Sequence, residues 1–399
     1  MAGIDLDRLA DLAVSFGANV QPGQIVGVTG EVEHAPLVRR IAARAYEKGA
    51  RFVDVGYFDP YVKRARVAHA PDGTLEFVPP WYGERWLALG REQAAYIGVS
   101  GPSEPGLLAD LDQERAGLDR LPMVKESLQV INERTVNWSI VPYATAGWAR
   151  TVHPELDEEA ALEKLWQQLA HVCRLDEPDP VAAWERRMEA TVGASERLTQ
   201  RRFDAIHFEG EGTDLRIGLL RSSRWFAARF ETTAGLVHHP NLPTEEVFTT
   251  PDPAATEGVV RATKPLVFSD GGLVRGLRVR FEAGVAVEIE ADEGAENLRA
   301  RTGEDDGGRR LGEVALVDGD GRIGPLGTVF YDTLLDENAA SHIAFGRGFD
   351  FACGDEDKTR VNQSATHIDF MIGGDGVDVT GITADGERVP VLVRGAWQI

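Results

Sequence analysis

The stretch IVGVTGEVEHAPLVRRIAARAYEKGARFVDVGY, residues 25–57, decides the fold of the first half of the chain. It opens with a short apolar run, continues from His34 as an amphipathic segment that stops at a glycine, and ends in a second β-prone run. A strand, a helix and a strand of these lengths form a parallel crossover unit. Similar apolar runs near Ala94 and Val136 predict an open, largely parallel α/β sheet.

The turn after the first predicted strand argues against a dinucleotide-binding site. The residues that follow IVGVTG are EVEHAP, which contain no G-x-G-x-x-G pattern. The carboxylates of Glu31 and Glu33 would repel a pyrophosphate at this position. We therefore expect no nucleotide cofactor.

The length of the chain and a change in its hydrophobic pattern, from helical spacing to short alternating runs, predict two domains. A chain of 399 residues exceeds the size at which one core usually stops growing. Residues 1–200 are predicted to form an N-terminal α/β domain with a helical connector that Pro178 and Pro180 break into two helices. Residues 201–399 carry short alternating runs, which predict an α+β C-terminal domain rich in antiparallel strands that holds a metal site. Helices are expected there near 294–302 and 337–345.

Composition limits the possible partners and the compartment. A formal net charge of -22 disfavours nucleic acids and anionic membranes, which both attract basic surfaces. Cys173 and Cys353 lack the spacing of a zinc knuckle or a disulfide scaffold. The N-terminal residues do not resemble an export signal, and no apolar run is long enough to span a membrane. These features predict a soluble cytoplasmic protein.

The stretch SATHIDFMIGGDGVDV, residues 364–379, places an imidazole and a carboxylate inside an apolar run. Successive side chains of a strand point to opposite faces, so His367 and Asp369 share one face. Ile368 and Phe370 lie on the other face. We expect that second face to be core and the first to be a site, although a structural His–Asp pair would give the same pattern.

Four more acidic residues and one more histidine lie between prolines or at the ends of predicted strands and helices. They are Glu245 and Glu246 in PTEEVFTTP, Glu313 at the start of an apolar strand, and Glu337 with His342, which we expect on or beside a helix. Each alone is more commonly structural. Imidazoles and carboxylates without cysteine suit Zn²⁺, Co²⁺, Mn²⁺ or Fe²⁺, whereas oxygen ligands alone suit Mg²⁺ or Ca²⁺. Two histidines with at least three carboxylates suffice for two ions that share a bridging carboxylate.

Four ordered motifs carry a resemblance to a known family. NLPTEEVFTTPD, LGEVALVD, TLLDENAASHIAFG and VNQSATHIDFMIG, together with the N-terminal ANVQPGQIVGV, resemble the aminopeptidase T and aminopeptidase S family of dinuclear metallopeptidases. The resemblance implies a cytoplasmic homodimer that binds two divalent ions (Co, Zn, Mn or Mg) and releases N-terminal residues from peptides with a free N-terminus and broad preference. It also implies the metal ligands Glu246, Glu313, Glu337, His342, His367 and Asp369.

The same resemblance assigns catalytic roles. Glu313 is the implied bridge between the two ions, and the catalytic set is Glu245, Glu246 and Glu313. Since Glu245 and Glu246 are adjacent, the one that is not a ligand is a candidate general base. We expect Glu246 to be the ligand. The working hypothesis is attack on the scissile carbonyl by a metal-bridging hydroxide.

One position departs from the family pattern. Phe349 stands where the family typically has a tyrosine, whose phenol can donate a hydrogen bond to the oxyanion of the intermediate. Tyr331 could replace that donor, the ions alone could polarise the carbonyl, or the chain could have drifted to a weaker activity.

Two other functions compete with a peptidase. A mononuclear Fe²⁺ ring-cleaving dioxygenase would use His342, His367 and Asp369 as a facial triad. Such a site has no use for three further glutamates. A weakly active peptide-binding relative is the third possibility.

Overall fold

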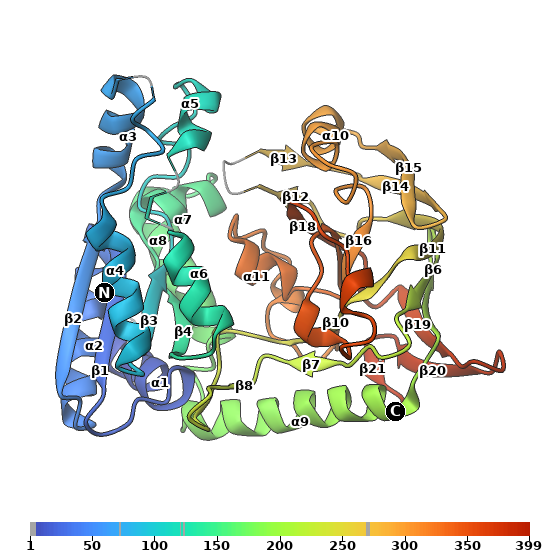
Figure 1. The fold of residues 1–399 in the computed structure, drawn as a ribbon, viewed down its shortest axis with the longest axis horizontal. Helices are drawn as coiled ribbons and strands as arrows, with labels where there is room; N and C mark the ends of the chain where they lie inside the picture. The colour runs from blue at the N-terminus through green and yellow to red at the C-terminus, as the bar shows by residue number, and fades with distance from the viewer. Residues whose placement is uncertain (1–4, 72, 120, 123, 269–271) are drawn as a thin grey trace. The chain divides into compact units, whose positions relative to one another are not determined.

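The computed structural model describes residues 5–71, 73–119, 121–122, 124–268 and 272–399 (Figure 1). Two compact units make up the chain. The first combines Met1–Arg186 with Arg229–Pro243, and the second combines Arg187–Ala228 with Thr244–Ile399. The predicted boundary between two domains at residue 200 stays a prediction, because a compact unit is not by itself shown to fold independently.

The first unit contains the predicted parallel sheet. Its four strands run in the order β2-β1-β3-β4, and every neighbouring pair is parallel. They are β1 (Ile25–Glu31), β2 (Phe52–Phe58), β3 (Ala95–Ser100) and β4 (Asn137–Pro142). The helices of this unit are α1 (Leu6–Leu12), continued as a π-helix over Ala13–Gly17, then α2 (Ala35–Glu47), α3 (Pro60–His69), α4 (Pro80–Arg91), α5 (Gln113–Leu118), α6 (Lys125–Asn132), α7 (Ala146–Val152) and α8 (Glu158–Val172).

Helix α2 shows why the crossover forms. Leu37, Ile41 and Ala45 recur at a spacing of four and are fully buried, so one stripe of the helix packs inward. Pro36 suits the first turn, where its missing N–H has no intrahelical partner. Gly49, with a φ of 89°, turns the chain toward β2.

The second unit is built from antiparallel sheets, as predicted. Its five-stranded sheet has the order β18-β17-β16-β10-β7, and its eight-stranded sheet has the order β15-β14-β11-β6-β5-β19-β20-β21. The five strands are β7 (Phe226–Ala227), β10 (Glu246–Thr249), β16 (Leu311–Val317), β17 (His342–Gly346) and β18 (His367–Met371). The eight are β5 (Ala205–Gly210), β6 (Thr213–Leu219), β11 (Pro251–Arg261), β14 (Arg278–Glu282), β15 (Val285–Glu290), β19 (Val377–Ile382), β20 (Arg388–Val393) and β21 (Ala396–Trp397).

Shorter elements complete the chain. The pair β8 (Phe230–Glu231) and β9 (Val237–His238) belongs to the first unit, and β12 (Leu266–Val267) pairs with β13 (Leu273–Val274) in the second. As predicted, the prolines separate α8 from a long helix, α9 (Pro180–Arg201). The predicted helix near 294–302 is present as α10 (Ala295–Thr302).

The core of the second unit joins both sheets. Ile343, Phe345, Ile368 and Phe370 of the five-stranded sheet belong to the same buried cluster as Phe281 of the eight-stranded sheet. Phe345 stacks on Phe370, with ring centroids 5.0 Å apart. The apolar face predicted for the strand at His367 is therefore core.

The predicted helix over 337–345 is wrong. Helix α11 (Thr333–Glu337) ends at Glu337, and His342 begins strand β17. All five residues of β17 are buried, and the strand pairs on both sides, with β16 and β18. A short apolar run buried on both faces has no alternation, so its sequence does not distinguish a strand from a helix.

Two smaller features concern the cysteines and the helices. Cys173 and Cys353 are both free and buried. Among the described residues, no helix is both long and apolar enough to cross a membrane.

The substitution Phe370→Ala tests the core beneath the site. Removing this fully buried ring should lower the free energy of unfolding by about 3–5 kcal/mol, because the cavity is closed in by both sheets. Urea unfolding followed by circular dichroism measures the change. Phe77→Ala, which removes a ring that is 62% exposed in the first unit, is the control. Equal midpoints for the two variants would contradict the assignment of Phe370 to the core.

Candidate metal centre

One face of the five-stranded sheet gathers the predicted site residues. Glu246 is the first residue of β10, and Glu313 lies on β16 opposite Ala344, which is in turn opposite Asp369 of β18. His342, on β17, is opposite Ala315. Because directly paired residues point to the same side of a sheet, these side chains emerge together on the face opposite the core.

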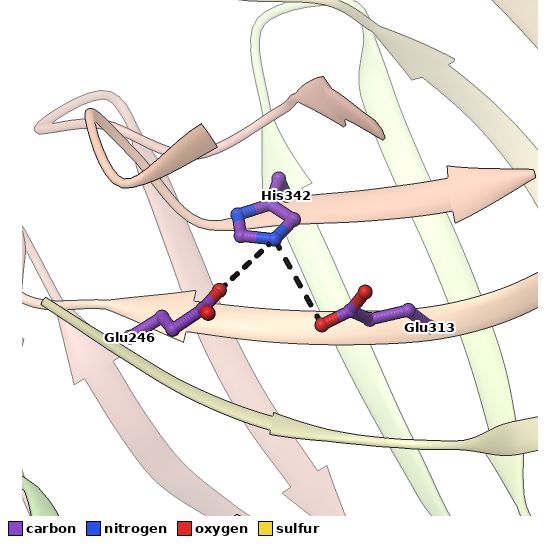
Figure 2. A group of neighbouring side chains, drawn as sticks. All are labelled: Glu246, Glu313 and His342. Carbon is purple, nitrogen blue, oxygen red and sulfur yellow. Dashed lines mark ion pairs between the residues drawn. The ribbon is translucent and has the colours of Figure 1, made fainter. Parts of the chain in front are cut away.

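Glu246, Glu313 and His342 form the first group of possible ligands (Figure 2). One ligand atom from each residue lies within 4.8 Å of the other two. His342 Nε2 is 3.2 Å from Glu246 Oε2 and 4.0 Å from Glu313 Oε1. Three donors at these distances from one another can surround a single divalent ion.

Glu313, His367 and Asp369 form the second group, again with ligand atoms within 4.8 Å of one another. His367 Nε2 is 3.1 Å from Glu313 Oε2 and 3.2 Å from Asp369 Oδ1. Glu313 therefore belongs to both groups, with Oε1 directed to His342 and Oε2 to His367. A carboxylate placed in this way can bridge two ions.

Both histidines present the same nitrogen to the carboxylates. His367 Nδ1 lies 2.8 Å from the carbonyl oxygen of Arg347, and His342 Nδ1 lies 3.3 Å from that of Ala340. A carbonyl oxygen only accepts, so Nδ1 carries the donated proton, and Nε2 is the nitrogen that is positioned to bind an ion once it is deprotonated. A carbonyl that orients an imidazole in this way is typical of metal-binding histidines.

Burial makes the charges in this group costly without a cation. Glu313 and His342 are 5% and 1% exposed. Burial raises the pKa of Glu313. Burial disfavours a charged ring at His342, but the carboxylates of Glu246 and Glu313 outweigh it and raise the pKa to about 10. The side chain of His367 is 31% exposed, so the group opens to solvent at that end.

Glu337 lies near this group but outside both sets of three. It closes helix α11, and the two sets do not include it within the described part of the chain. Burial, together with the carboxylates of Glu246 and Asp369, raises its pKa well above the usual value. Its carboxyl group therefore interacts electrostatically with the same centre.

The residues fit divalent metal ions. Two buried oxygens, Glu246 Oε2 and Asp369 Oδ1, accept no hydrogen bond from any residue that the structure describes. Metal ligands bind in their deprotonated form, in which Glu246, Glu313, Glu337 and Asp369 would carry four negative charges and the two imidazoles none. Two divalent cations would balance them and satisfy both oxygens.

Glu245 points to a different environment from Glu246. It is 1% exposed, and its carboxylate pairs with the guanidinium of Arg187, which also binds Asp318 through two nitrogens at 2.8 and 3.0 Å. The backbone N–H of Glu245 donates to Asn338 Oδ1 at 2.7 Å. Glu245 is thus held in a buried ionic network at the start of β10.

Sequence reasoning missed three members of this network. Asn338 follows Glu337 and Asp318 ends the LGEVALVD motif, so proximity to predicted ligands was an available signal for both. Arg187 lies in α9, in a run rich in charged residues, and its sequence context gave no signal of burial.

The Phe349 ring lies beside a candidate ligand. Its centroid is 5.5 Å from that of His367. Tyr331, with a φ of 56°, lies in the turn before α11. Its proposed replacement of the missing phenol stays a prediction.

Comparisons with known proteins agree along the whole chain. Residues 3–397 match the family described as thermophilic metalloprotease (M29). Aminopeptidase T of Thermus aquaticus is 44% identical, over 99% of this chain and 98% of that protein, and aminopeptidase AmpS of Bacillus subtilis is 37% identical, over 98% of each. The solved structure of wild-type AmpT from Thermus thermophilus covers 99% of both chains, with a TM-score of 0.92 and 42% identity.

A second solved structure shares the fold at much lower identity. 2,5-Dihydroxypyridine dioxygenase from Pseudomonas putida KT2440 has a TM-score of 0.55 and 11% identity. At that identity the likeness shows the fold alone.

These findings define a metalloprotease of the aminopeptidase class. The chain belongs to the M29 family of thermophilic metalloproteases. The predicted family and the predicted metal-dependent aminopeptidase activity, a hydrolase activity on peptides, are confirmed, and the dioxygenase alternative is not favoured. The predicted divalent metal requirement is supported by the family and by the two ligand groups.

The substitution Arg187→Leu tests the buried network. It removes the guanidinium that compensates the buried carboxylates of Glu245 and Asp318, so the free energy of unfolding should fall by about 3–5 kcal/mol. Thermal and urea unfolding measure the loss. Arg280→Leu, at an exposed ion pair on β14, is the control and should leave stability nearly unchanged. Equal stability of the two variants would refute the role given to Arg187.

Proposed function

We propose that this metal centre holds two divalent ions and that it releases N-terminal residues from peptides with a free amine. Glu246 and His342 would bind one ion, His367 and Asp369 the other, and Glu313 both. Glu337 supplies a further carboxylate. The observation that supports the proposal most directly is the position of Glu313, whose two oxygens face two different histidines.

The carboxylates of this site explain why it would act at the N-terminus of a peptide. When bound, the ions supply an activated water at neutral pH and polarise the scissile carbonyl. The surrounding carboxylates attract the positively charged amine of a peptide's N-terminus. A blocked or internal peptide segment lacks that charge, so the site favours removal of terminal residues.

Glu245 is best placed to position Glu246 and not to contact the substrate itself. Its carboxylate is engaged by Arg187, and its backbone is tied to Asn338, the residue after Glu337. We infer that Glu245 fixes the start of β10, so that Glu246 is directed into the metal centre and Glu337 is kept beside it. The sequence-based role of Glu245 as a general base is the competing proposal.

The predicted homodimer stays part of the proposal. The first unit exposes a group of large apolar side chains on its edge strand β2 and on the two helices that follow. Its members include Phe52, Tyr57, Tyr61, Val62 and Trp81. Phe52 and Tyr57 are five residues apart on β2 and point to opposite faces, so these side chains do not define one surface, and the homodimer rests on the resemblance.

Metal removal tests the main proposal. Protein stripped with a chelator should lose hydrolysis of leucine p-nitroanilide and regain it with Co²⁺, Zn²⁺, Mn²⁺ or Mg²⁺. Elemental analysis of the reloaded protein should give two ions per chain. N-acetylated substrate serves as the control and should not be cleaved. Full activity after stripping, or one ion per chain at saturation, would be incompatible with the proposal.

The substitution Glu245→Gln separates the two roles of this residue. A positioning role predicts that metal affinity falls by about 10–100-fold, while kcat at saturating metal stays close to that of the unmodified enzyme. If Glu245 is the general base, its replacement should instead lower kcat by about 10²–10⁴-fold at every metal concentration. Activity measured across a metal titration distinguishes these results, and Asp318→Asn, which weakens the same network, should follow the positioning pattern.

A further inference from the structure

Four phenylalanines form a continuous aromatic cluster that begins at the metal centre. The Phe349 ring, 5.5 Å from the ring of His367, lies 5.3 Å from that of Phe248 and 5.4 Å from that of Phe351. Phe226 closes the cluster, 5.4 Å from Phe351 and 6.3 Å from Phe248. These spacings are those of packed aromatic rings.

The sheet directs this cluster to the side that carries the metal ligands. Phe248 is two residues after Glu246 on β10, so both side chains point to the same face. Phe226 of β7 is paired directly with Phe248 and shares that face. Phe349 and Phe351 reach it from the segment after β17.

The cluster is buried at its base and open at its rim. Phe248 is 6% exposed, Phe349 is half-buried, and Phe351 is 48% exposed. The side chain of His367, next to Phe349, is also partly open to solvent. Aromatic surface is therefore available to a ligand directly beside a candidate metal ligand.

We propose that Phe226, Phe248, Phe349 and Phe351 form the subsite for the side chain of the substrate's N-terminal residue, which favours large apolar and aromatic residues. The inference rests on the function proposed above, because the ions would hold the amine and the carbonyl of that residue. The proposal places the side chain of that residue against the rings beside His367. A leucine or phenylalanine side chain offers a large apolar surface to the rings, whereas the methyl group of alanine offers little.

This subsite also gives Phe349 a positive role. A phenol at this position would add a polar group to an otherwise apolar wall. Phe349 keeps the wall apolar from His367 to Phe351, at the loss of a hydrogen-bond donor.

Substrate selectivity tests the subsite. The metal-loaded enzyme is assayed with p-nitroanilides of phenylalanine, leucine, alanine and lysine, and kcat/KM is compared. The phenylalanine and leucine substrates should exceed alanine by about tenfold or more. Phe351→Ala should reduce the phenylalanine-to-alanine ratio by about tenfold, mainly through KM for the phenylalanine substrate. Phe349→Leu, which keeps apolar volume at the wall, should retain the preference for leucine over alanine.

The outcomes of this experiment distinguish failure of the subsite from failure of the peptidase proposal. Phe77→Ala, an exposed ring in the first unit, should leave the ratio unchanged. A wild-type enzyme that cleaves alanine and phenylalanine substrates equally, or a ratio unaffected in Phe351→Ala, would overturn the subsite while leaving the peptidase intact. A preference for lysine would also overturn it. Cleavage of none of the substrates by protein with bound metal would overturn both proposals.

Discussion

The negative charge collected on one face of the five-stranded sheet is the constraint on which the second unit depends. Glu246, Glu313, Glu337 and Asp369 carry four carboxylates into a largely buried region, where charge without a partner is costly. The protein itself supplies two imidazoles, each oriented by a carbonyl oxygen. In their ionised form these carboxylates favour bound cations, and the position of Glu313 divides the possible ligands into two groups.

The geometry of this face is fixed from behind by the core. Ile343, Phe345, Ile368 and Phe370 occupy the opposite face and pack against the eight-stranded sheet. A shift of one residue in the pairing of β17 or β18 would bring these side chains to the metal side and the ligands into the core. The Arg187 network adds a second restraint at the start of β10, where two adjacent glutamates must point in opposite directions.

Much of this arrangement follows from local sequence rules. The parallel sheet of the first unit follows from its strand and helix spacing, and alternation in β18 separates His367 and Asp369 from the core residues between them. His342 was expected near a helix, because a strand buried on both faces has no alternation to read. The pairing of Arg187 with Glu245 and the aromatic cluster join segments far apart in the chain. Such contacts depend on tertiary packing, which local patterns do not encode.

The shared carboxylate of Glu313 is the central claim, and metal content in single substitutions tests it most directly. Loss of His342 removes a ligand from one group only, whereas loss of Glu313 removes a ligand from both. Elemental analysis at limiting metal should find about one tightly held ion per chain in His342→Ala and close to none in Glu313→Ala, with both variants folded by circular dichroism. Equal metal content in the two variants, or one ion retained in Glu313→Ala, would contradict a bridging role.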